Sequence, residues 1–181
     1  MKLAGSCPEN WRQMMAVSAA HVEVPGISIV PARREHALSL GPRLRREDRN
    51  ELAAACGLPP ETALLRAVVC SELCWAALDG KRSIALFGAA AIPGSRAGSP
   101  WLLGSGELVG AGRVFARYTA EYLGRMLQRF SRLENWVDAR NQVAVRWLAR
   151  CGFVVGKAEA YGPFHLPFHP FHMGGDVCVL Q

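Results

Sequence analysis

Hydrophobic positions along this chain change their period repeatedly, and each change indicates a new element. Short apolar stretches indicate strands, whereas apolar residues at three- and four-residue spacing indicate helices. Strands are expected at residues 27–32, 74–78, 83–92, 101–103, 133–137 and 153–155. Helices are expected at residues 33–40, 45–55, 60–73, 110–132 and 138–151. This order predicts an α/β (α+β) fold with helices flanking a mixed sheet.

The longest expected helix, 110–132, has two distinct faces. Its apolar residues at helical spacing predict the buried face: Phe115, Tyr118, Tyr122, Leu123, Met126, Leu127 and Phe130. Charged residues at four-residue spacing form a second stripe: Arg113, Arg117, Glu121, Arg125 and Arg129. A solvated helix face explains this stripe. The alternative is a surface that binds phosphate or an acidic partner.

Breaks in the pattern divide the chain into two regions. Pro25-Gly26 separates an N-terminal arm, 1–26, from a domain that covers 27–181. A capping-box spacing at Ser6 and Glu9 predicts a short helix over 7–20 in the arm. Its apolar residues dock either on a partner or on the domain itself. Further along, Asp79-Gly80 predicts a hairpin between two strands.

Composition narrows the class of protein. The chain has 181 residues, of which 50% are hydrophobic and 20% charged, which suits one domain with a sizeable core. No apolar run is long enough to predict a membrane span. The net charge of +6 is spread along the chain, so no specific nucleic-acid binding is expected. Six cysteines without a Cys-x-x-Cys pair indicate reduced core thiols, and no metal site is expected among them.

The C-terminal region combines three histidines with three phenylalanines. His165, His169 and His172 are a possible metal triad, but prolines between them break helical register and no acidic ligand accompanies them. The alternating aromatic residues at 164, 168 and 171 favour an aromatic loop that packs on the sheet. The expectation is therefore a packed loop without a metal, followed by an apolar stretch at 177–180.

Two motifs occur in the order that a known fold requires. One is Asn141-x-x-Ala144-Val145-x-Trp147-Leu148-x-x-Cys151-Gly152-Phe153, and the other is Glu107-x-x-Gly110-x-Gly112. The first resembles the last helix and following strand of the Gcn5-related N-acetyltransferase (GNAT) fold. The second has the spacing of that fold's pyrophosphate loop. The resemblance covers about residues 27–180 and implies a mixed, mostly antiparallel sheet.

The resemblance also implies acetyl-CoA as a ligand. Backbone N–H groups of the loop and of the helix start would hold the pyrophosphate. The residues it implies at the cofactor are Leu103, Val109, Gly110, Ala111, Gly112, Arg113 and Asn141. Glu107 departs from the family pattern because a carboxylate repels a pyrophosphate unless Arg113 offsets it. The alternative is that the glycines only make a flexible surface loop.

The groups for proton transfer match the family less well. The family's general acid, a tyrosine on the last helix, falls on Leu148, and Tyr161 is a possible substitute. Glu107 and Asp138 are candidates for the general base by position only. Asp138 is better explained as the N-cap of the last helix. Asn141 has two open roles, a cap or a contact with the pantetheine arm.

A narrower resemblance rests on Asn135-Trp136-Val137-Asp138-Ala139-Arg140-Asn141 and the Phe-His-x-Phe-x-Met ending. These strings look like the acetyltransferase-like proteins of tailed bacteriophages, a group that includes internal virion protein A. The resemblance implies a weakly active or inactive component of the virion or its assembly, located in the virion or host cytoplasm. Its partners would be other virion proteins or itself. The alternative is an active acetyl-CoA-dependent N-acyltransferase that acts on a small-molecule or protein amine.

Overall fold

The structure, a computed structural model, describes residues 26–109 and 112–175. Its strands are β1 (Ile27–Pro31), β2 (Leu73–Asp79), β3 (Arg82–Ala91), β4 (Ala97–Gly104), β5 (Arg132–Asp138), β6 (Val154–Val155), β7 (Glu159–Tyr161) and β8 (Leu166–Gly174). Its helices are α2 (Arg34–Leu40), α3 (Arg46–Cys56), α4 (Pro60–Cys70), α5 (Gly112–Arg129) and α6 (Gln142–Arg150). Two short 3-10 helices, η1 (Gly41–Arg43) and η2 (Gly106–Val109), join them.

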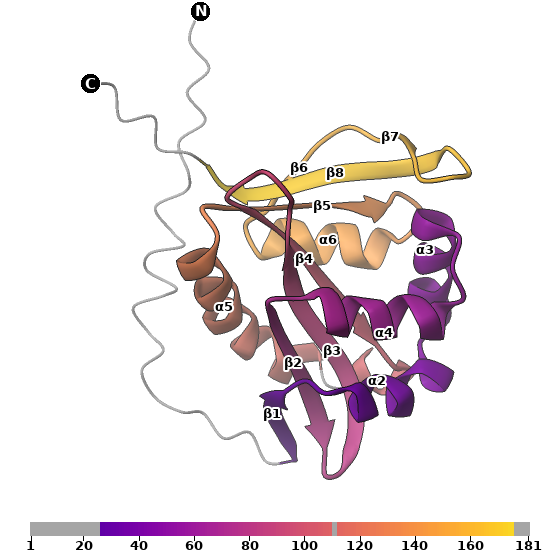
Figure 1. The fold of residues 1–181 in the computed structure, drawn as a ribbon, viewed down its shortest axis with the longest axis vertical. Coiled ribbons are helices and arrows are strands. Elements are labelled where there is room, and N and C mark those ends of the chain that lie inside the picture. Colours follow the sequence, from indigo (N-terminus) through magenta and orange to yellow (C-terminus); the bar gives the residue numbers. More distant parts are fainter. Residues whose placement is uncertain (1–25, 110–111, 176–181) are drawn as a thin grey trace, which may run out of the picture.

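The strands form one sheet in the order β1-β2-β3-β4-β5-β8-β6, and β7 also pairs with β8. Every pairing is antiparallel except that of β4 with β5, which is parallel and joins only Ala97 to Arg132 and Gly98 to Leu133. Beyond these pairs the two strands separate, and β5 and β8 run across the direction of β2, β3 and β4 (Figure 1). The predicted mixed, mostly antiparallel sheet flanked by helices is confirmed.

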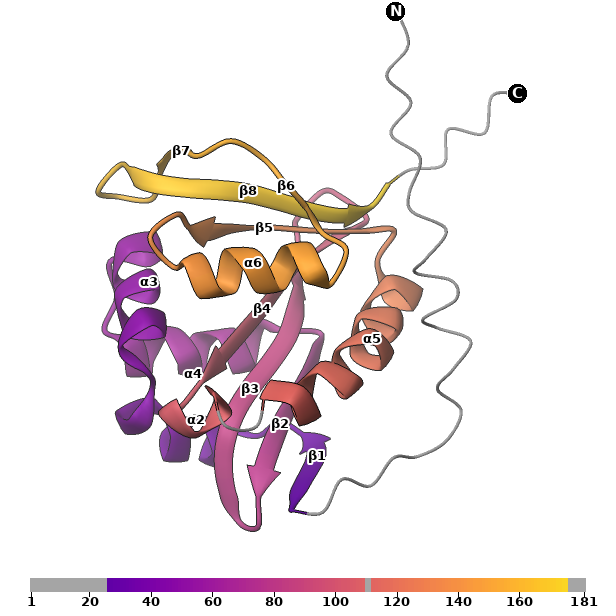
Figure 2. The same cartoon turned by 180° about the vertical axis from the view of Figure 1, so that it is seen from behind.

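Two hydrophobic clusters cover the two faces of the sheet. Helices α2 and α4 lie on one face, where Leu40 and Leu64 pack against Leu86 of β3. Helices α5 and α6 lie on the opposite face, as Figure 2 shows, where Tyr122 and Phe87 belong to the larger cluster. Adjacent residues of β3 therefore serve different cores, because side chains alternate along a strand.

Turn and cap residues in the sequence predicted several helix ends and the hairpin correctly. Helix α3 ends at Gly57, whose φ of 66° is the left-handed conformation that glycine adopts without strain. The hairpin predicted at Asp79-Gly80 is confirmed, since Asp79 pairs with Arg82. Strand β4 is longer than the expected 101–103, because its N-terminal half pairs with β3 although it contains Gly98 and Pro100.

The expectation of a C-terminal aromatic loop is wrong. Residues 166–174 form β8, which pairs along seven residues with β5. Prolines are rare in inner strands because they lack a donor N–H. Here the carbonyl of Pro170 still accepts a 2.7 Å hydrogen bond from the N–H of Gly156, so the strand keeps an acceptor role at that position. His169 and His172 fall on opposite faces of β8 because of strand alternation.

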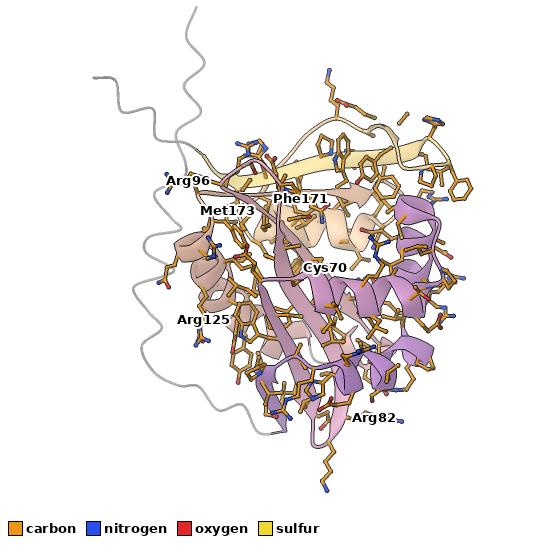
Figure 3. All side chains as sticks on the ribbon, in the orientation of Figure 1. Cys70, Arg82, Arg96, Arg125, Phe171 and Met173 are labelled. Carbon is orange, nitrogen blue, oxygen red and sulfur yellow. The ribbon has the colours of Figure 1, made fainter. Side chains whose placement is uncertain are left out.

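The charged stripe of α5 is partly described. Arg125 pairs with Glu121 at 2.6 Å, and Arg129 pairs with Glu72 of the segment before β2 at 2.5 Å. Arg125 lies on the outer side of α5, whereas Phe171 of β8 is buried in the larger cluster (Figure 3). These ion pairs favour a solvated helix face.

The cysteines depart from the expectation of core thiols. Cys56 and Cys70 are exposed, and Cys74 and Cys151 are partly buried; all four described cysteines are unpaired. Cys70 ends α4 whereas Cys74 lies in β2, so the helix expected to 73 ends earlier. Burial raises the pKa of both the Cys74 and the Cys151 thiol to about 12.

Some predictions fall outside the described residues. They include the arm helix at 7–20 and the apolar stretch at 177–180. The division into an arm and a domain at residue 26 therefore stays a prediction. In the described part of the chain, no single helix is long and apolar enough to cross a membrane. Helices α3 and α4 together have the length and composition of a membrane span, but they form a pair bent by 76°.

Candidate functional site

The separation of β4 from β5 opens a gap in the sheet. Gly98 lies where the strands last pair, and a Cβ there would lie 2.5 Å from the ring of Phe130, so the packing requires glycine. Beyond this point the side-chain amide of Asn135 on β5 donates a 2.9 Å hydrogen bond to the carbonyl of Pro100 on β4. This bond spans the gap where the backbone ladder has ended.

A cavity of about 410 Å³ passes through this gap. Its walls include members of both clusters: Phe87, Tyr122 and Met126 from the α5 face, and Trp101 and Leu103 from the α4 face. Helices α3 and α6 supply further walls. The cavity therefore connects the two faces of the sheet and has an apolar end at α5 and a more polar end at α3.

The first turn of α3 pairs with the edge of β4 at Gly104. The Asp48 carboxylate accepts a 2.7 Å hydrogen bond from the N–H of Gly104, and the N–H of Arg45 donates to the carbonyl of Gly104 at 3.0 Å. Asp48 is 2% exposed and pairs with the Arg45 guanidinium at 2.7 Å. Burial raises the pKa of Asp48, and the Arg45 charge opposes this rise. Asp48 and Arg45 thus neutralise each other and together bind both backbone groups of Gly104 at the end of β4. We call this buried pair the clamp.

Glu51 is one turn further along α3 and also lines the cavity. Its carboxylate accepts a 2.9 Å hydrogen bond from the Asn141 side chain, 90 residues away in the sequence. Burial raises the pKa of Glu51 to about 7. The Asn141 hydrogen bond and Arg45 oppose this rise, whereas the charges of Asp48 and Asp138 add to it. Both protonation states of this carboxyl are therefore populated near neutral pH.

Asp48 and Glu51 were not expected at a site, because they lie within a run of charged residues typical of a solvated helix. A signal was nevertheless present. Asp48, Glu51, Leu52 and Ala55 follow the three- and four-residue spacing of one helix face, and all four line the cavity. Carboxylates are usually found on the solvated face of a helix. Two of them on the apolar face of α3 therefore indicate a functional cavity.

Asn141 takes one of the two roles that the sequence left open, that of a cap, and contact with the pantetheine arm stays a prediction. Its Oδ1 accepts a 3.2 Å hydrogen bond from the N–H of Ala144, which makes it the N-cap of α6, and its side chain lines the cavity. The prediction that Asp138 caps this helix is wrong. Asp138 ends β5 and instead accepts 2.9 Å hydrogen bonds from the N–H and the guanidinium of Arg140. Burial alone would raise the pKa of Asp138, but Arg140 outweighs it and lowers that pKa.

Of the other positions considered for proton transfer, two line the cavity and two do not. Leu148 is 7% exposed and lines the cavity, as does Tyr161 of β7, whose ring stacks on Trp136 with centroids 4.6 Å apart. The two carboxylates first considered as bases, Glu107 and Asp138, are not among the residues that line it. Glu107 lies at 3.4 Å from Arg43 and 3.2 Å from Arg82.

The expected pyrophosphate loop is described only in part. A hydrogen bond from Ser105, and then the charges of Arg43 and Arg82, lower the pKa of Glu107. These two arginines compensate the charge of the Glu107 carboxylate, which departs from the family pattern. Leu103 lines the cavity, Val109 ends η2 and Gly112 begins α5. Gly110, Ala111 and the side chain of Arg113 lie outside the described part.

The histidines do not come together. The N-terminal end of β8 follows His165, which has a φ of 51°, and His169 donates from Nδ1 to the carbonyl of Gly156 at 2.8 Å. Within residues 26–109 and 112–175, no group of three histidine, cysteine, aspartate or glutamate side chains is arranged to hold a metal ion.

Comparisons with known proteins identify the fold. No protein-family model matches the chain, and no curated protein matches it. The ribosomal-protein-S5-alanine acetyltransferase of Vibrio fischeri is 17% identical and has a TM-score of 0.60, over 86% of this chain and 96% of that one. A GCN5-related N-acetyltransferase from Kribbella flavida is 19% identical, with a TM-score of 0.58 over 83% and 98%.

A third similar structure was solved with ligands. The spermidine N-acetyltransferase of Vibrio cholerae, in complex with CoA and spermine, is 16% identical, with a TM-score of 0.57 over 82% of this chain and 95% of that one. Identities this low carry the fold and not the activity. By its sheet order, its separated strands and these neighbours, the chain has the GNAT fold.

Proposed function

We propose that this chain is an N-acyltransferase that transfers an acyl group from CoA to an amine. The observation that carries the proposal is the cavity that passes through the sheet between β4 and β5. Walls from both faces of the sheet suit a thioester on one side of the gap and an acceptor on the other. Fold alone does not fix an activity, so the argument rests on the groups that line this cavity.

The open edge of β4 supports binding of the pantetheine arm. The carbonyl of Pro100 and both backbone groups of Gly104 form hydrogen bonds on the side of β4 that faces the gap. The backbone groups of even-numbered residues of β4 therefore point toward the gap. By strand alternation the N–H and C=O of Leu102, between them, face it too. Pantetheine carries amide groups that pair with such an edge as an added strand does. The apolar side chains of Tyr122, Ala144 and Leu148 suit its methylene groups.

The start of α5 supports the position of the pyrophosphate. Helix α5 begins at Gly112 within the predicted loop motif, and its 18 residues give it a helix dipole with the positive end there. Glycines in this segment permit close approach of the backbone to a phosphate. Val109 to Arg113 therefore stay the proposed pyrophosphate site.

A role in a phage particle stays a prediction from sequence. The string that carries that resemblance, residues 135–141, supplies the Asn135 bond across the gap, the Asp138 pair with Arg140 and the Asn141 cap. These residues thus have roles within the fold, independent of any particle. The predicted weak activity rests on Leu148 and Glu107, whereas Glu51 supports an active enzyme.

Calorimetry with acetyl-CoA tests the proposed function. The wild-type protein is expected to bind with a Kd on the order of micromolar. Gly112→Asp is expected to abolish binding, because a carboxylate would meet the pyrophosphate. Gly106→Asp is the matched control, since a Cβ at Gly106 has no atom within 4 Å and the charge change is the same. Unchanged melting temperatures would show that both variants fold.

Two results would contradict the proposal. The first is a wild-type protein that does not bind acetyl-CoA at millimolar concentration. The second is equal affinity in the Gly112→Asp variant and the wild type, which would remove the pyrophosphate from the start of α5.

A further inference from the structure

We propose, on the basis of the proposed function, that Glu51 accepts the proton of the acceptor amine and that the α3 end of the cavity takes a monoamine with an aromatic or branched apolar body. The sequence motifs do not contain Glu51. The inference rests on position, on charge pairing and on the side chains that surround the carboxylate.

Glu51 is held in place and still accessible from the cavity. Its carboxylate accepts the 2.9 Å hydrogen bond from Asn141, and Asn141 is itself fixed by its bond to the N–H of Ala144. Asn141 is 6% exposed, so it has little freedom to move. The Glu51 side chain is partly exposed and lines the cavity, so a bound amine can reach it. A fixed acceptor at the cavity wall meets the geometric requirement for a general base.

Charge pairing distinguishes Glu51 from the acids around it. Asp48 on the same helix is paired with Arg45 and with the N–H of Gly104, and Asp138 at the end of β5 is paired with Arg140. Strand β4 contributes no titratable side chain, and β7 contributes the Tyr161 hydroxyl. Among the described residues that line the cavity, Glu51 is therefore the carboxylate without an arginine partner.

The protonation equilibrium of Glu51 suits this role. Its pKa of about 7 follows first from burial and then from the charges of Asp48 and Asp138, opposed by Asn141 and Arg45. A base with a pKa near the working pH is both deprotonated often enough and strong enough to accept a proton. An ordinary glutamate, with a pKa of 4.5, would be a weaker base.

The remaining walls indicate the class of acceptor. The cavity that Glu51 lines is also lined by Leu52, Trp101 and the stacked pair of Trp136 and Tyr161. One unpaired carboxylate matches one ammonium group. Each further ammonium of a polyamine would have to leave water for apolar surroundings near Arg45, which is costly. An apolar or aromatic body instead gains from burial against these rings.

The transfer step balances as follows. The ammonium group of the acceptor gives one proton to the Glu51 carboxylate and becomes a neutral amine. Its nitrogen forms a bond to the acyl carbon of the thioester, and the carbon–sulfur bond breaks with its electron pair on sulfur. The second proton leaves the nitrogen and is taken up by the departing thiolate. The products are the amide, the free thiol of CoA and one proton, which Glu51 returns to solvent.

Steady-state kinetics with acetyl-CoA test the inference, with 2-phenylethylamine and spermidine as acceptors. Glu51→Gln keeps an oxygen for the Asn141 hydrogen bond but cannot accept the proton. It is expected to lower kcat/KM by about 10² to 10⁴-fold. The control is Glu47→Gln on the same helix, since Glu47 is exposed and pairs with Arg46. This variant is expected to match the wild type.

A pH profile separates a proton acceptor from a merely structural residue. The ratio of kcat/KM in the wild type to that in Glu51→Gln is expected to rise as pH increases through about 7 and then level off. Ionisation of the amine itself cancels in this ratio. Binding of acetyl-CoA by calorimetry is expected to be unchanged in Glu51→Gln.

The outcomes distinguish the two proposals. A wild-type protein that does not bind acetyl-CoA would overturn the proposed function and this inference together. If acetyl-CoA binds, turnover of Glu51→Gln within a few-fold of wild type, or a ratio independent of pH, overturns the role of Glu51 alone. Higher kcat/KM for spermidine than for 2-phenylethylamine, or no turnover of either amine, overturns the acceptor class.

Discussion

The two ends of the cavity differ in what their side chains can do. At the α5 end, Phe87, Tyr122 and Met126 offer rings and aliphatic groups that bind apolar atoms and exclude water. At the α3 end, Asp48 and Glu51 bring carboxylates to the same cavity. The α5 end is mainly apolar with tyrosine and threonine hydroxyls, whereas the α3 end carries Glu51, a carboxyl that exchanges its proton near neutral pH. The comparison supports the proposal that ligand binding and proton transfer depend on opposite ends of one cavity.

The two ends also depend on different forces for their stability. Apolar burial at the α5 end stabilises the fold roughly in proportion to the area removed from water. At the α3 end, burial of a charge is unfavourable unless a partner compensates it. Asp48 has such partners in Arg45 and Gly104, whereas Glu51 has an amide instead of a cation. Substitutions at the two ends should therefore differ in size and in pH dependence.

The largest effect is expected from Asp48→Ala. This change removes the acceptor for the Gly104 N–H and leaves the Arg45 guanidinium without its partner in a largely buried position. Breaking a buried pair in this way typically costs about 3 to 5 kcal/mol. Chemical denaturation would measure it. Glu47→Ala, which removes an exposed carboxylate, should change stability by less than about 0.5 kcal/mol; equal effects of the two variants would contradict the clamp.

The next effect concerns the pH dependence of Glu51→Gln. The folded protein holds the Glu51 proton with a pKa of about 7 against an ordinary value of 4.5, so the stability from protonated Glu51 is full below pH 4.5 and is lost as pH rises through 7. This loss amounts to at most about 3 kcal/mol, because the side chain retains some contact with solvent. Glutamine cannot ionise. The variant should therefore match the wild type at pH 4 and melt several degrees higher at pH 8.

Melting curves of both proteins between pH 4 and pH 8 check this expectation. A constant difference between wild type and variant across that range would mean that Glu51 titrates in the folded protein as it does in an unfolded chain. It would also remove the physical difference proposed between the two ends of the cavity.

The smallest of the three effects is expected at the apolar end, from Leu148→Ala. Deletion of a buried leucine side chain costs about 2 to 5 kcal/mol, and the lower limit applies because Leu148 already borders a cavity. No charge is involved, so the loss should be the same at pH 5 and pH 8. Val69→Ala on the exposed side of α4 is the control, with little expected change. A loss that varies with pH would contradict the assignment of Leu148 to an apolar wall.

Local sequence signals predicted much of the frame around the site. The Asp79-Gly80 turn and the glycine after α3 act over a few residues, so their outcome is independent of the rest of the chain. The capping role of Asn141 was predictable for the same reason, since the free N–H groups of a helix start lie within three residues. Its place near the cofactor was implied only by the resemblance to the GNAT fold. Asp138 was misjudged because Arg140, two residues on, competes for its carboxylate.

Neighbouring strands decided the conformation of the C-terminal region. Prolines at 167 and 170 argue locally against a strand, and the sequence accordingly predicted a loop. In the fold, β5, β6 and β7 all pair with this segment, and their combined hydrogen bonds outweigh the missing proline donors. No local pattern contains that information, because the pairing partners lie up to about 40 residues upstream.

The sequence by itself determined the order of helices and strands from β1 to β6, the hairpin and several helix ends, because hydrophobic period, turn residues and caps act over short distances. The tertiary structure alone decided where chemistry is possible. It separated β4 from β5, placed Glu51 of α3 against Asn141, and left that carboxylate with an amide rather than a cation as its partner. The pKa of a side chain depends on burial and on charges that approach through space, and residues 90 positions apart acquire that relation only when the chain folds.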